Sequence, residues 1–157
     1  MSKIAPFLWF DTQAEEAMNF YVSVFRDAKA GKIMQAGPGG PVLTVEFELA
    51  GQRFIGLNGG PQFRFNEAVS LFINCEDQAE VDELWAKLTA DGGAEGRCGW
   101  LKDRFGVSWQ VIPRALAEAL GDPDRDRAQR AMQAMMGMGK IDVEGLRRAA
   151  DGLPVAA

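Results

Sequence analysis

The sequence predicts an α+β fold made of two βαβββ modules and a C-terminal helical extension. Alternating apolar and polar segments, typical of strands, are interrupted twice by segments with helical spacing, so the order strand, helix, three strands occurs twice. The tripeptide Gln-Ala-Glu begins both helical segments, at Gln13 and at Gln78. A glycine followed three residues later by an aromatic residue begins the last strand of each module, at Gly51 and Gly106. Two matches in the same order favour an internal duplication.

The first module begins with an apolar, aromatic strand over residues 4–10, followed by a helix from Gln13 to Phe25. Asp11 or Thr12 is expected to cap this helix. Three further strands are expected at Lys32–Gln35, Val42–Leu49 and Arg53–Asn58. The glycine- and proline-rich residues 37–41 lead into a strand and lack the Gly-Lys-Ser/Thr of a phosphate-binding loop, so they are interpreted as a plain connection.

The second module repeats this order. A strand over Ala68–Cys75 precedes a helix over Gln78–Ala90, for which Glu76 or Asp77 is the expected cap. Asp91-Gly92-Gly93 ends the helix, because glycine readily adopts the left-handed conformation found at helix C-termini. The last two strands are expected at Ala94–Leu101 and Gly106–Pro113.

The stretch Trp100–Pro113 has the pattern of a β-hairpin around the connection Asp103-Arg104-Phe105-Gly106. Alternation along its second strand places Val107, Trp109 and Val111 on one face, and Ser108, Gln110 and Ile112 on the other. The first face is apolar and the second is mixed. The mixed face is therefore either the lining of a ligand pocket or the surface of an ordinary half-buried strand.

Beyond Pro113 the pattern becomes helical. Helices are expected at Ala115–Leu120, from Asp122-Pro123-Asp124 through Arg127–Gly137, and from a cap at Asp142 through Ala150. Ala128, Ala131, Met132, Met135 and Met136 lie along one side of the middle helix. This stripe is either an adaptable binding surface or, as we favour, a face that docks on the domain or on a partner subunit.

The composition excludes several classes of protein. With 157 residues, of which 47% are hydrophobic and 25% charged, the chain is long enough for one domain or for two half-size modules that share a core. A net charge of -5 without a basic cluster argues against a nucleic-acid partner. The apolar runs are too short for a signal peptide or a membrane span, so we expect a cytoplasmic protein with no membrane partner.

The sequence contains no histidine. This excludes Ser-His-Asp and Cys-His catalytic groups and any site with imidazole metal ligands. Acid-base chemistry would fall to carboxylates, cysteine, lysine or Tyr21. Cys75 and Cys98 lack the Cys-x-x-Cys spacing, and we expect them to be buried or half-buried thiols.

The chain carries the motifs Phe7-Leu8-Trp9-Phe10, Ala14-Glu15-Glu16-Ala17, Phe20-Tyr21, Phe25, Trp100, Asp103-Arg104-Phe105-Gly106, Trp109-Gln110-Val111-Ile112-Pro113 and the later segment from Met132 to Asp142. Together these motifs resemble the PhnB-like branch of the vicinal oxygen chelate superfamily, which includes glyoxalases, extradiol dioxygenases and bleomycin-resistance proteins. The resemblance implies cupped mixed sheets formed by the paired modules. It divides the chain into a two-module domain over residues 1–113, with modules at about 1–62 and 63–113, and an extension over 114–157.

Some members of this branch carry the name 3-demethylubiquinone-9 3-methyltransferase. We find no Gly-x-Gly-x-Gly loop after a first strand in this chain to hold S-adenosylmethionine, so that cofactor and that activity are implied by the family label alone.

Metal-dependent members of the superfamily place His, Glu or Gln ligands on the first and fourth strands of each module. Within one residue of register, the corresponding positions are Ala5, Pro6 and Phe7; Phe54, Ile55 and Gly56; Ser70, Leu71 and Phe72; and Trp109, Gln110 and Val111. Only Gln110 lies where a glyoxalase-like glutamate would sit. A lone amide oxygen does not hold a divalent ion, so no metal and no other cofactor is predicted.

What remains is a cup with apolar, aromatic and a few polar groups, suited to a small, partly aromatic molecule. The candidate ligand-binding residues are Trp9, Asn58, Trp100, Asp103 and Gln110. Each also has a structural explanation: Trp9 in the core, Asn58 in a turn, Trp100 in cross-strand packing, Asp103 as a turn former or ion-pair partner of Arg104, and Gln110 as a strand residue. No catalytic residue is assigned.

Two classes of function stay open. The first is a metal-free binding protein comparable to the bleomycin-resistance members. The second is an enzyme, either a methyltransferase as the label implies or a lyase or isomerase that uses carboxylates. A homodimer is expected, because two small modules leave strand edges and apolar surface to cover, and the helix around Met132–Met136 is a ready covering element.

Overall fold

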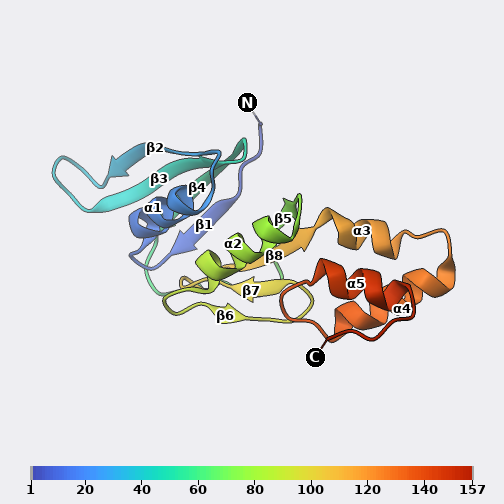
Figure 1. The fold of residues 1–157 in the computed structure, drawn as a ribbon. Coiled ribbons are helices and arrows are strands. Elements are labelled where there is room, and N and C mark those ends of the chain that lie inside the picture. The colour runs from blue at the N-terminus through green and yellow to red at the C-terminus, as the bar shows by residue number, and fades with distance from the viewer. Residues whose placement is uncertain (1, 157) are drawn as a thin grey trace. The chain divides into compact units, whose positions relative to one another are not determined.

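The computed structural model describes residues 2–156, which form eight strands and five helices. They divide into two compact units, one ending at Phe65 and the other beginning at Asn66. Each unit contains a four-stranded sheet with one parallel and two antiparallel strand pairs (Figure 1). The predicted α+β fold of two βαβββ modules is therefore confirmed.

The first unit has the sheet order β1-β4-β3-β2. Its elements are β1 (Phe7–Phe10), α1 (Ala14–Val24), β2 (Ala28–Gln35), β3 (Val42–Leu49) and β4 (Gln52–Asn58). Helix α1 covers one face of this sheet (Figure 1). On that face the ring of Phe47 stacks on Phe54, with centroids 5.2 Å apart, and lies at a tilt to Tyr21, with centroids 5.8 Å apart. Because side chains alternate along a strand, Phe7 and Trp9 lie on the opposite face.

The start of α1 differs from the prediction. The N-cap residue is Gln13, not Asp11 or Thr12, and its side chain makes no capping bond. Instead, Asn58 at the end of β4 accepts the backbone N–H of Ala14 at 2.8 Å. A partner 44 residues away in the sequence takes the place of the expected local cap, which no local pattern can reveal.

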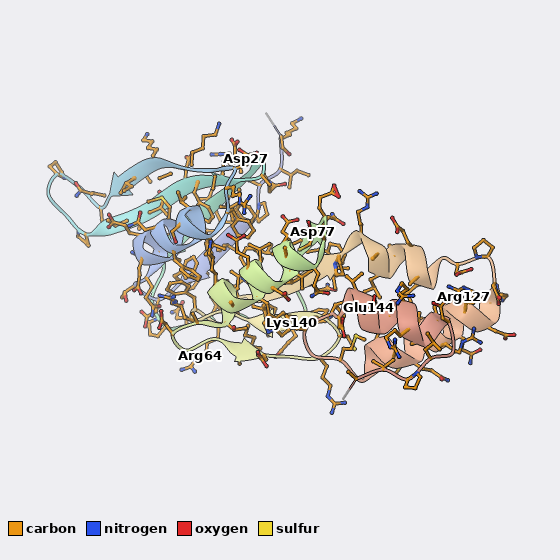
Figure 2. The ribbon with its side chains drawn as sticks, in the orientation of Figure 1. Asp27, Arg64, Asp77, Arg127, Lys140 and Glu144 are labelled. Atoms are coloured by element: carbon orange, nitrogen blue, oxygen red, sulfur yellow. The ribbon has the colours of Figure 1, made fainter. Side chains whose placement is uncertain are left out.

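The second unit begins with the same topology, in the order β5-β8-β7-β6. Its elements are β5 (Ser70–Cys75), α2 (Gln78–Thr89), β6 (Ala94–Glu95), β7 (Trp100–Lys102) and β8 (Ser108–Pro113). Asp77 caps α2 as expected by accepting the backbone N–H of Glu80 at 2.9 Å (Figure 2). The strand expected over Ala94–Leu101 is instead split in two, because Cys98 and Gly99 adopt positive φ angles of 57° and 84°.

The hairpin expected over Trp100–Pro113 is present as β7 and β8, and Gly106 adopts the positive φ of 87° at its turn. Trp109 and Val111 are buried on the side of α2. Cys75 is buried and Cys98 is half-buried, and both thiols are free, as predicted.

The C-terminal helices belong to the second unit. They are α3 (Arg114–Leu120), α4 (Arg125–Met136) and α5 (Val143–Ala150). Asp124 caps α4 by accepting the N–H groups of Asp126 and Arg127, and Asp142 is the N-cap residue of α5, without a side-chain capping bond. None of the helices in the described residues is long and apolar enough to cross a membrane.

The extension docks on its own unit through an apolar cluster. Ile112 of β8 packs with Leu116, Ile141 and Leu146, and Met135 and Met138 pack against the edge of this cluster. Gln78 of α2 donates to the carbonyl of Ile141 at 2.9 Å and accepts the N–H of Val143 at 2.7 Å. Lys140, in the loop before α5, pairs with Asp82 of α2 at 2.7 Å (Figure 2). The methionine stripe thus docks only in part, since Met132 and Met136 remain exposed.

Candidate functional site

Three residues form a row across the second sheet. Phe72 of β5 and Trp100 of β7 are both directly opposite Gln110 of β8 in the strand register. Direct partners point to the same face of a sheet, and Trp109 and Val111, which alternate with Gln110, are buried on the side of α2. The row therefore lies on the face turned away from α2, which we call the Gln110 face. Phe72 is 53% exposed there, and the other two residues are half-buried.

One end of the Gln110 face is polar. Ser108, two residues before Gln110 on β8, is directly opposite both Ser70 and Lys102. The side-chain amide of Gln110 donates to the Ser70 hydroxyl at 2.9 Å. The Ser108 side chain is only 1% exposed, and its hydroxyl has no hydrogen-bond partner within residues 2–156.

Lys102 at this polar end forms an exposed ion pair with Glu67, which precedes β5. The hydrogen bond from the Lys102 ammonium, together with its charge, lowers the pKa of the Glu67 carboxyl. The polar end therefore holds a buried hydroxyl, a second hydroxyl and a cation whose carboxylate partner is exposed to solvent.

The other end of the Gln110 face is apolar and closed. Ile112 lies two residues beyond Gln110 and is buried by the C-terminal extension. The backbone N–H groups of Cys98 and Gly99 each donate at 2.8 Å to the carbonyls of Met138 and Gly139. The extension thus seals the Ile112 end and also anchors the backbone directly before Trp100.

Asp103, a predicted site residue, lies away from Gln110. Its carboxylate is 2% exposed and accepts the N–H groups of Phe105 and Val107 at 2.9 and 3.0 Å, and the indole N–H of Trp109 at 2.8 Å. Since Trp109 lies on the α2 side, Asp103 organises the hairpin from that side. Arg104 next to it pairs with Asp91 at 3.1 Å.

The two predicted site residues of the first unit also have structural partners. The amide of Asn58 accepts the N–H of Ala14 and donates to the carbonyl of Val42 at 3.1 Å, so it ties α1 to two strands. The indole of Trp9 donates to the Gly60 carbonyl at 2.9 Å and packs edge-on against Phe63, with ring centroids 5.0 Å apart. A Cβ at Gly59 would lie 2.4 Å from the Trp9 ring, so glycine is required there.

The first unit also has an open groove of about 440 Å³ near the start of α1. It is lined by Asp11, Thr12, Glu15, Ala36, Pro41, Val42, Leu43 and Asn58. Its acidic residues are exposed, and the Asn58 amide is already bonded on both sides. The groove therefore has the volume for a small molecule, but its lining residues have no buried polar group that is available to bind one.

Of the five predicted site residues, the structure brings Trp100 and Gln110 together on one face and places Asp103 on the other side of the same sheet. Phe72, Ser108 and Lys102 were missing from the predicted set. The alternation that places Ser108 on the same face as Gln110 was visible in the sequence, but the pairing with Phe72 and Lys102 depends on strand order.

A sequence model of the family described as 3-demethylubiquinone-9 3-methyltransferase matches residues 2–112. The chain belongs to this family. A search of curated proteins found no match. Among solved structures, a PhnB protein from Bacillus cereus that carries the same methyltransferase description is 36% identical, with 71% of this chain and 99% of that chain covered and a TM-score of 0.65.

Two further structures share the fold at low identity. A Pseudomonas aeruginosa protein is 19% identical, with coverage of 72% and 98% and a TM-score of 0.61. A glyoxalase/bleomycin resistance protein from Albidiferax ferrireducens is 14% identical, with coverage of 72% and 99% and a TM-score of 0.50. The family match ends at residue 112, so it does not include the Met132–Asp142 segment in which we also expected the resemblance.

The family implies two bound groups, a divalent metal ion and S-adenosylmethionine, and the residues present fit neither of them. Strand alternation and register leave Phe7, Ile55, Phe72 and Gln110 at the positions that hold metal ligands in the superfamily's metal-dependent members. Three of these four are hydrocarbon side chains, and the described residues contain no group of three or more Cys, Asp or Glu that could hold an ion. For S-adenosylmethionine, β1 is followed by Asp11-Thr12-Gln13, which lacks the glycines of a binding loop.

Proposed function

We propose that this chain binds a small, flat, partly aromatic molecule on the Gln110 face, without a metal and without S-adenosylmethionine. The observation that carries the proposal is the row itself: two aromatic side chains stand on the strands that flank Gln110, on the sheet face that α2 leaves uncovered. Large aromatic groups exposed beside a polar anchor are typical of ligand sites. The family's enzymatic label stays a prediction, because no observation on this chain favours it.

The spacing of the row suits one ring. Neighbouring strands lie about 4.8 Å apart, so Phe72 and Trp100, two strand spacings from each other, are separated by roughly 9.5 Å at their backbones. A ring stacked between two others occupies roughly 7 to 8 Å, counting about 3.5 to 4 Å for each contact. A flat ligand therefore fits over Gln110 with an aromatic side chain on either side, and Gln110 supplies orientation through its amide.

The test uses 2-naphthalenemethanol, a neutral flat probe, in a fluorescence titration or by isothermal titration calorimetry. We expect Phe72→Ala to weaken its binding about tenfold, because the variant removes one aromatic wall. Val69→Ala is the matched control: Val69 is also an exposed apolar residue of this unit, but it lies outside the row. Binding should be unchanged after chelator treatment, and S-adenosylmethionine should not bind.

The proposal fails if the probe does not bind at millimolar concentration, or if Phe72→Ala and Val69→Ala have the same effect. It also fails if removal of a stoichiometric divalent ion abolishes binding.

We further propose a homodimer in the cytoplasm. The dimer is supported by exposed apolar side chains in both units, including Phe7 and Phe63 in the first and Met132 and Met136 in the second. Sedimentation equilibrium at micromolar concentration should show a species of twice 17.1 kDa. A single species at the monomer mass would contradict the dimer, and recovery of the native protein in a membrane or secreted fraction would contradict the location.

A further inference from the structure

The Ser108 hydroxyl is an unexplained polar group of the second unit. It is almost completely buried, and no hydrogen bond to it occurs among the residues described. A buried polar group without a partner destabilises the folded state, so such groups in native proteins call for an explanation. A ligand that supplies the missing bond is one such explanation, and the position of Ser108 favours it.

Ser108 lies at the polar end of the proposed ligand face. Successive residues on one side of a strand are about 7 Å apart, so Ser108 is one such step from Gln110 along β8. The Lys102 ammonium is on the neighbouring strand in the same row. A hydroxyl that donates, beside a cation, suits a group that only accepts hydrogen bonds and carries negative charge.

We propose that the ligand is an aromatic acid, an inference that rests on the proposed function. The ring of the acid lies over Gln110. Its carboxylate accepts the Ser108 O–H and lies beside Lys102. In the free protein, the Lys102 ammonium forms an ion pair with the Glu67 carboxylate. The ligand's carboxylate takes that place on binding. The exchange is easy, because the Glu67–Lys102 pair is exposed and exposed pairs contribute little to stability.

The closed end of the face limits the size of the acid. From the Ser108 row to the Ile112 row is two steps of about 7 Å, and the C-terminal extension buries Ile112 at the far end. A carboxylate with one or two fused rings fills this length, whereas a longer chain would meet the extension. The ligand class is thus a compact aromatic carboxylate.

The experiment compares 2-naphthoate with neutral 2-naphthalenemethanol. We expect the wild type to bind 2-naphthoate more tightly, and Ser108→Ala to weaken 2-naphthoate about three- to tenfold while changing the neutral probe much less. Ser108→Ala should also raise the melting temperature of the free protein, because it removes a buried group without a partner. A Ser108→Ala variant that is more stable than the wild type but binds 2-naphthoate more weakly would show that the hydroxyl serves the ligand. A serine with a purely structural role would not give this combination.

Two exposed substitutions test the charge without perturbing the fold. Glu67→Gln should strengthen 2-naphthoate binding, because it removes the competing carboxylate, and Lys102→Gln should weaken it. Lys87→Gln is the matched control, since Lys87 also forms an exposed ion pair, with Glu83, but on α2.

The outcomes separate the two proposals. If neither naphthalene compound binds, the proposed function itself fails. If both bind equally and Ser108→Ala and Lys102→Gln change neither, the site stands and the aromatic-acid assignment is wrong. A Ser108→Ala variant that loses stability would also overturn the assignment, because the hydroxyl would then be bonded within the fold.

Discussion

The carboxylate of Asp103 accepts the indole N–H of Trp109 at 2.8 Å, and with its other oxygen it accepts two backbone N–H groups of the hairpin. Asp103→Ala removes the acceptor of all three hydrogen bonds, and we expect it to lower the free energy of unfolding by about 3 kcal/mol. Asp103→Asn should lower it less, since one oxygen remains for the backbone. Urea denaturation measures both.

Asp91→Asn is the control for Asp103→Asn, because the Asp91 carboxylate makes its ion pair with Arg104 at the exposed surface, and asparagine tolerates the positive φ of 54° at this position. Its effect should stay below about 1 kcal/mol. Equal effects of Asp91→Asn and Asp103→Asn would contradict the role of Asp103 in the hairpin.

Asn58 is expected to be a stability residue of the first unit. Asn58→Ala removes the acceptor for the Ala14 N–H and the donor to the Val42 carbonyl. We therefore expect the free energy of unfolding to fall by about 2 kcal/mol. Asn58→Asp keeps an acceptor at the start of α1 and loses only the donor, so it should retain part of the stability. Thermal unfolding of the two variants checks this order, and the reverse order would contradict the assigned contacts.

The two cysteines should differ in reactivity. Burial, with a smaller contribution from the Glu80 charge, raises the pKa of the Cys75 thiol to about 12. At pH 8.5, iodoacetamide should therefore label half-buried Cys98 and leave Cys75 unlabelled until the protein unfolds. Mass spectrometry of the labelled peptides gives the result, and faster labelling of Cys75 would contradict it.

The same thiol makes stability depend on alkaline pH. In the unfolded chain a cysteine ionises near pH 8.5, whereas folded Cys75 stays protonated up to about pH 12. The folded state binds more protons than the unfolded state in this window. The contribution of Cys75 to the free energy of unfolding is therefore complete below about pH 8.5 and is lost as the pH rises toward 12. In the Cys75→Ala variant, the melting temperature should fall less steeply between pH 9 and 11 than in the wild type. An unchanged slope would contradict the raised pKa of Cys75.

Gln78 is expected to hold the C-terminal extension to α2. Gln78→Ala removes bonds to Ile141 and Val143, so hydrogen exchange should accelerate in α5 while the strands of both sheets keep their protection. Gln13→Ala is the matched control, because Gln13 is the equivalent residue of the first module. If the two variants exchange alike in α5, the docking role of Gln78 is wrong.

Trp100 should contribute more than Gln110 to binding the neutral naphthalene probe. Trp100→Ala removes about 60 Å² of aromatic contact surface, which at about 25 cal/mol per Å² corresponds to roughly 1.5 kcal/mol. Gln110→Ala removes one polar contact and frees the Ser70 hydroxyl, a smaller change of about 1 kcal/mol or less. Calorimetric titration of both variants gives the order, and a larger loss for Gln110→Ala would contradict stacking as the main contribution.

Local patterns account for most of the fold. The strand Val42–Leu49 was predicted at its observed bounds, and the repeated Gln-Ala-Glu motif located both the duplication and the start of α2. Two of the misplaced boundaries occur where a residue's partner is distant in the sequence. The cap of α1 comes from Asn58, and the interruption between β6 and β7 faces the loop at Met138 and Gly139.

The sequence by itself determined the family, the two modules and the absence of histidine, because each depends on residue types and on their spacing along the chain. Only the tertiary structure decided which side chains meet. Gln110 lies between Phe72 and Trp100, and Ser108 lies beside Lys102, because β8 is inserted between β5 and β7 in the sheet. Asp103 turns to the opposite side, since its neighbour in space is Trp109. Strand order and register arise from packing of the whole unit, which no local period encodes.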